Sequence, residues 1–136
     1  YIFGNNTSQK KTAMTTSAKQ EKIAMTAPVK QQLQNGIWKV SFVMPAKYQM
    51  HTLPKPNNTI VIINQILKKR YVVIQFSGLN SNENIEHHEK LLMRYIKKEN
   101  IKTVGLVTYA FYNPPWTLPF MRRNEIMFEI ERISEN

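Results

Sequence analysis

The sequence predicts an α+β domain, and three observations support this prediction. At 136 residues the chain is long enough for one domain, residues 1–136, with a substantial core. Short runs of β-branched and aromatic residues recur along it, separated by connections rich in Pro and Asn. Residues 82–99 show the apolar period of an amphipathic helix. From residue 60 onward the predicted order is therefore strand, strand, helix, strand, strand.

Two strands are predicted in the first third of the chain, after a polar segment. Residues 4–22 are rich in Thr, Ser and Lys and are typical of a loop. Residues 23–29 form the first apolar run and residues 37–43 the second. The second run alternates between polar side chains and large apolar ones, which are Trp38, Val40 and Phe42. Residues 45–59 are predicted to be a connection.

Two more strands and the helix are predicted in the middle of the chain. Residues 60–66 and 71–76 are β-branched runs with basic residues near the turn between them, which suggests a hairpin. Ser81 is a suitable N-cap for a helix that runs from Asn82 to about Glu99. The predicted apolar stripe of this helix consists of Ile85, His88, Leu92, Tyr95 and Ile96.

A proline-rich segment separates the last two predicted strands, residues 106–112 and 125–131. We call residues 112–125 the Pro loop; it contains three prolines and a pair of arginines. Each proline fixes its own φ and removes a backbone donor, so the segment is predicted to be stiff and extended. Its large apolar side chains either cap the core or form one wall of a pocket; they are Trp116, Leu118, Phe120 and Met121.

The order of predicted elements suggests a repeated unit. If the unit from residue 60 occurs twice, the first copy lacks its two leading strands and most of its helix. Residues 1–6 resemble the last turn of a helix that stops at Gly4. We therefore hypothesise that the N-terminal part of the first half is missing, which a comparison of the protein's mass with the encoded reading frame tests.

Composition narrows the classes of function. The chain contains no cysteine, which excludes disulfides and thiol chemistry, and no apolar stretch approaches the roughly 18 residues of a membrane span. The net charge is +10, and residues 1–70 carry eleven basic groups against one Glu. Such an uneven excess fits a soluble surface rich in Lys and Asn, or binding to nucleic acid, anionic lipid or an anionic small ligand. No recognition helix or stacking platform accompanies the basic residues, so nucleic acid is not expected as a partner.

Five segments follow one another along the chain: KIAMTAPV at 22–29, WKVSFVMP at 38–45, LPKP at 53–56, FSG at 76–78, and NPPWTLPFMRRNE at 113–125. Together they resemble the SOUL haem-binding protein family over nearly the whole chain. The resemblance implies a distorted antiparallel β-barrel of two ββαββ halves with helices on its outside. It also implies non-covalent binding of haem or another tetrapyrrole by a carrier, buffer or sensor, with no common catalytic activity.

A haem site needs an apolar slot and cations for the two propionates. The resemblance supports the Pro loop as one wall, where arginine suits bidentate contact with carboxylates. The candidate haem-binding residues are Met25, Tyr112, Trp116, Phe120, Met121, Arg122 and Arg123. A histidine proposed as axial ligand in some family members lies upstream of the segment matching Tyr1. No histidine here matches it: His51 lies in a loop, His87 is expected in solvent, and His88 is expected to be packed or capped.

Two other functions remain open at this stage. A protein-interaction module that has lost its ligand would explain the missing axial histidine, and exposed strand edges would permit a dimer as well as a monomer. Glu125 would serve a Glu-dependent hydrolase of a similar fold if its carboxyl were buried with a raised pKa. The structural alternative for Glu125 is a salt bridge to Arg122 or Arg123.

Overall fold

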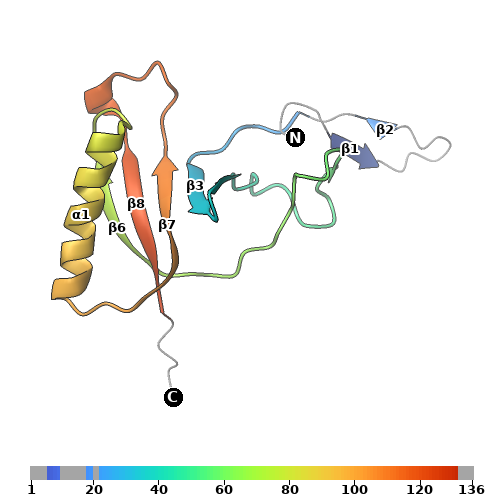
Figure 1. The fold of residues 1–136 in the computed structure, drawn as a ribbon. Coiled ribbons are helices and arrows are strands. Elements are labelled where there is room, and N and C mark those ends of the chain that lie inside the picture. The colour runs from blue at the N-terminus through green and yellow to red at the C-terminus, as the bar shows by residue number, and fades with distance from the viewer. Residues whose placement is uncertain (1–5, 10–17, 20–21, 132–136) are drawn as a thin grey trace. The chain divides into compact units, whose positions relative to one another are not determined.

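The computed structural model describes residues 6–9, 18–19 and 22–131. The chain divides into two compact units, each formed by two stretches of sequence. Residues 1–26 and 43–67 form the smaller unit, and residues 27–42 and 68–136 form the larger one. The larger unit contains the Pro loop and is shown with the rest of the chain in Figure 1.

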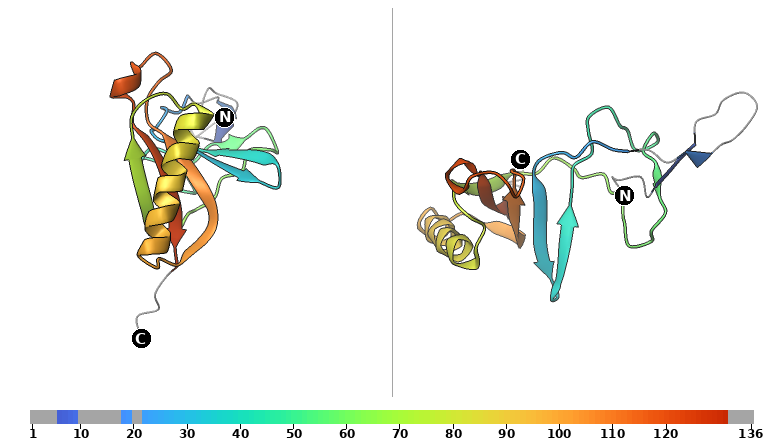
Figure 2. Two further views of the ribbon diagram at one scale, coloured as in Figure 1. Left: turned by 60° about the vertical axis from the view of Figure 1, so that its left-hand side comes forward. Right: turned by 90° about the horizontal axis from the view of Figure 1, so that it is seen from above.

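The larger unit is built on a five-stranded antiparallel sheet. Its strands are β3 (Val29–Gln34), β4 (Ile37–Ser41), β6 (Tyr71–Phe76), β7 (Thr103–Phe111) and β8 (Asn124–Ile130). They follow one another in the order β4-β3-β7-β8-β6, so in the described residues β4 and β6 are the two edges. The α+β prediction is confirmed, and the sheet is curled but not closed, which is consistent with a distorted open barrel (Figure 2).

The β3–β4 hairpin begins later than the sequence predicted. Residues 23–28 are not a strand, and the strand starts only after Pro28, whose nitrogen has no hydrogen to donate. Asn35 and Gly36 connect β3 to β4 with φ values of 51° and 78°. Two consecutive positive φ values are typical of a type I′ turn, for which Asn-Gly is the preferred sequence.

The predicted hairpin of residues 60–66 with residues 71–76 is wrong. Residues 60–66 form no strand, and Ile60, Ile62 and Ile66 are exposed. β6 pairs with β8 instead, from Tyr71 opposite Glu129 to Phe76 opposite Asn124. A β-branched run alone therefore did not determine the pairing.

One helix, α1 (Asn82–Lys98), packs against one face of the sheet, as Figure 2 shows. Its predicted bounds are confirmed, and the Ser81 hydroxyl accepts a hydrogen bond from the Asn84 backbone N–H as an N-cap. The prediction that Tyr95 belongs to the buried stripe is wrong, because more than half of its surface is exposed. The buried core consists of Phe76, Leu92 and Ile126, flanked by Val72, Ile74, Ile85, Ile96, Val107, Tyr109 and Phe128.

The smaller unit contains a three-stranded antiparallel sheet in the order β2-β1-β5. Its strands are β1 (Asn6–Gln9), β2 (Ala18–Lys19) and β5 (Lys55–Pro56). The prediction of a loop over residues 4–22 is therefore wrong at β1 and β2, because backbone pairing overrode the polar composition. The helical turn predicted for residues 1–6 falls mainly outside the described residues.

Candidate functional site

Backbone and side-chain hydrogen bonds hold the Pro loop in place between β7 and β8. The Gly78 N–H donates to the Pro119 carbonyl at 2.8 Å, which ties the loop to the β6–α1 connection. Arg122 donates from Nε to the Thr117 carbonyl at 2.8 Å and from Nη2 to the Pro115 carbonyl. A short 3₁₀ helix, η1 (Pro119–Met121), lies between these contacts. Hydrogen bonds within the loop therefore add to the stiffness that its prolines predict.

The large apolar side chains of the Pro loop are exposed. Trp116 is 83% exposed and Phe120 is 74% exposed, and Leu118 and Met121 are also more than half exposed. Of the two expectations for these residues, a cap on the core does not describe them, because they bury little surface against the described residues. A loop that holds four such side chains in solvent has the character of a ligand or partner surface.

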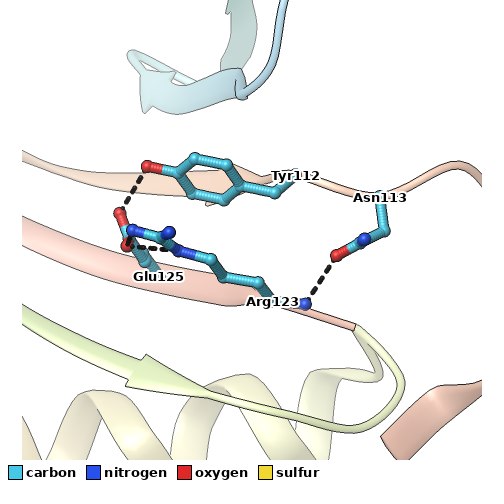
Figure 3. Close-up of polar contacts among 4 residues, drawn as sticks. All are labelled: Tyr112, Asn113, Arg123 and Glu125. Carbon is cyan, nitrogen blue, oxygen red and sulfur yellow. Dashed lines mark hydrogen bonds and ion pairs between the residues drawn. The ribbon is translucent and has the colours of Figure 1, made fainter. Parts of the chain in front are cut away.

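At the base of the Pro loop, three side chains form a compact polar cluster (Figure 3). Glu125 Oε1 accepts hydrogen bonds from Arg123 Nε at 2.9 Å and Nη2 at 2.6 Å, and Oε2 accepts one from the Tyr112 hydroxyl at 2.7 Å. The Arg123 guanidinium also lies 4.3 Å from the centre of the Tyr112 ring. The salt bridge expected for Glu125 is therefore present, and its partner is Arg123.

The contacts in the cluster favour the protonated forms of Tyr112 and Arg123. Burial, followed by the hydrogen bond to Glu125, raises the pKa of the Tyr112 hydroxyl. The hydrogen bond to the same carboxylate raises the pKa of Arg123. Glu125 is almost fully buried, and each of its oxygens already accepts a hydrogen bond. Its arrangement is that of an anchor for the start of β8.

An open hollow of about 690 Å³ lies beside this cluster, where the end of β6, α1 and the Pro loop meet. Four predicted site residues line it: Phe120, Met121, Arg122 and Arg123. Tyr112 and Trp116 are not among its lining residues, and Met25 belongs to the smaller unit. The sequence analysis missed the other lining residues as site residues, which are Gln75, Phe76, Ser77 and His88. Two signals pointed to them, since FSG at 76–78 is one of the five segments and His88 lies on the helix stripe.

His88 is packed and capped, as expected. Its ring stacks on Phe76 with centroids 4.1 Å apart and planes 8° from parallel. Its Nδ1 lies 2.8 Å from the Asn84 carbonyl oxygen. His87 lines a second, smaller hollow at the start of α1, and His51 is exposed.

A comparison with family models matches most of the chain. The model of the SOUL heme-binding protein family matches residues 16–129. The chain belongs to the SOUL family. No curated protein and no solved structure gives a significant match to it.

The hollow of this SOUL protein is lined by both apolar side chains and arginine cations, the two kinds of group that a tetrapyrrole with propionates needs. Phe120 and Met121 offer exposed apolar and polarisable surface, and the nearly buried Phe76 also lines the hollow. Across residues 6–9, 18–19 and 22–131, no three or more His, Cys, Asp or Glu side chains come together in a group that could hold a metal ion. In the same residues, no helix is long and apolar enough to cross a membrane.

Proposed function

We propose that this SOUL protein binds haem or another tetrapyrrole non-covalently at the hollow formed by β6, α1 and the Pro loop. The observation that carries the proposal is that Phe120, Met121 and Arg122 line this hollow in a chain that belongs to a haem-binding family. We favour a carrier, buffer or sensor over a Glu-dependent hydrolase. The reason is that Glu125, the carboxylate that a hydrolase would use, is held by Arg123 and Tyr112 in the geometry of a structural ion pair.

The two arginines of the Pro loop have different roles in this proposal. The charge of Arg123 is offset by Glu125, with which it makes two hydrogen bonds. Arg122 donates to neutral backbone carbonyls and has no carboxylate partner among the described residues. Its charge is therefore available to an anionic ligand. We assign Arg122 to a haem propionate and Arg123 to holding Glu125.

A titration of the protein with haemin, followed through the Soret band, tests the proposal. We expect a saturable shift, accompanied by quenching of tryptophan fluorescence. Arg122→Gln weakens haemin binding, whereas Arg94→Gln, on the exposed face of α1, leaves it unchanged. Haemin dimethyl ester has no propionate charge, so it binds the wild type and Arg122→Gln equally. The proposal fails if the wild type shows no saturable shift.

A second candidate is self-association through β4, which a separate observation favours. In the described residues β4 pairs only with β3, and all five of its side chains are exposed. Trp38 and Val40 thus lie beside an unpaired row of backbone donors and acceptors, which is a template for a strand from a second copy. Light scattering during gel filtration tests this candidate: Val40→Lys gives a monomer if β4 pairs with itself, and a wild type that stays monomeric at all concentrations rejects it.

A further inference from the structure

His88 is the one histidine that lines the hollow. Its Nδ1 lies 2.8 Å from the carbonyl oxygen of Asn84, one turn earlier in α1. Since a carbonyl oxygen only accepts hydrogen bonds, Nδ1 carries the proton in this pair. In the neutral ring, Nε2 then keeps an unprotonated lone pair, which is the form of imidazole that binds metals.

Two contacts fix the direction of this ring. One is the hydrogen bond to Asn84, and the other is the stacking on Phe76, which keeps the ring planes 8° from parallel. A histidine that ligates a metal nearly always donates its other N–H to a carbonyl or carboxylate, which sets its tautomer and orientation. His88 therefore has the supporting contact of a ligand before any ligand is bound.

The other ring nitrogen of His88 is accessible. Nε2 makes no hydrogen bond to the described residues. His88 is only half-buried, and no buried side-chain nitrogen or oxygen of the described residues lacks a partner. It follows that Nε2 is reached by solvent. Packing on Phe76 explains the position of the ring, but a packing role alone gives no reason for an open nitrogen in a side chain that lines the hollow.

We propose that His88 ligates haem iron through Nε2. This inference rests on the proposed function and assigns a ligand in α1, whereas the axial histidine proposed for some family members lies upstream of the segment matching Tyr1. Phe120 and Met121 line the same hollow and are exposed, so they are available to contact the macrocycle.

The test compares haemin with iron-free protoporphyrin IX in the full chain. His88→Phe keeps an aromatic ring against Phe76 and removes the nitrogen, and His87→Phe is the matched control on the adjacent helix position. We expect His88→Phe to lose about tenfold or more in haemin affinity, with an altered Soret band and an unchanged affinity for protoporphyrin. His87→Phe retains the wild-type values for both porphyrins.

The outcomes separate this inference from the proposed function. If the wild type binds neither porphyrin, the proposed function fails. If haemin binds but His88→Phe gives the wild-type spectrum and affinity, the ligand assignment alone is wrong. Equal loss of both porphyrins in a folded His88→Phe also rejects ligation and leaves His88 a packing role. Should that variant not fold, resonance Raman spectra of the wild-type ferrous complex decide the question, because the absence of an iron–histidine stretching band overturns the assignment.

Discussion

Phe120 offers the sharpest test of where the tetrapyrrole lies. A phenylalanine buries roughly 150–250 Å² when fully covered, and 74% of Phe120 is exposed in the free protein. If the ligand covers half of that exposed area, about 75 Å² of apolar surface leaves water, which contributes about 2 kcal/mol. Phe120→Ala should then weaken binding about 10- to 30-fold.

The same exposure predicts that folding is unaffected. Phe120 makes little contact with the core, so its truncation should change the free energy of unfolding by less than about 0.5 kcal/mol. Haemin titration gives the affinity, and urea denaturation monitored by circular dichroism gives the stability. Trp116→Ala is the matched control, because Trp116 is similarly exposed on the same loop and does not line the hollow. Equal losses in the two variants, or wild-type affinity in Phe120→Ala, would refute the placement.

Three further predictions concern the scaffold. Ile126→Ala removes a side chain that is 1% exposed and should cost about 2–5 kcal/mol in urea denaturation, whereas Ile60→Ala in the exposed segment should cost less than about 0.5 kcal/mol. Gly36→Ala places a side chain at φ 78° and should cost about 1–2 kcal/mol; an unchanged midpoint contradicts the type I′ turn. Burial, then the Glu89 hydrogen bond, raises the pKa of Tyr109, so the wild type should lose stability above about pH 10 more steeply than Tyr109→Phe.

Local signals predicted several elements even where their partners lie far away in the sequence. The Ser81 cap and the helical period gave α1 its bounds, and runs of β-branched or apolar residues gave β6 and β8 to within a residue or two, although these two strands pair with each other across some fifty residues. Residues 60–66 have the composition of a strand, but composition does not reveal whether a pairing partner exists. The opposite error occurred at β3, whose sequence VKQQLQ is too polar for a strand signal and is paired because the Asn-Gly turn folds it onto β4.

The candidate site was predictable where the motif and the geometry coincide. Phe120, Met121, Arg122 and Arg123 lie on one short stretch, so any hollow beside the Pro loop contains several of them. Tyr112 lies at the start of the Pro loop, but its hydroxyl donates a hydrogen bond to Glu125, and it does not line the hollow. The contribution of Phe76 and His88 depends on α1 lying beside the end of β6, which is a tertiary contact that residue spacing does not encode.

The bonds that close the Pro loop on itself have a kinetic consequence. Hydrogen bonds from Arg122 and from the Gly78 N–H already hold the backbone of the loop. The loop therefore loses little backbone entropy when a ligand covers its apolar side chains. Association should then need no slow rearrangement, and its observed rate should rise linearly with ligand concentration. For the proposed tetrapyrrole-binding role, differences in affinity among variants should therefore appear mainly in the dissociation rate.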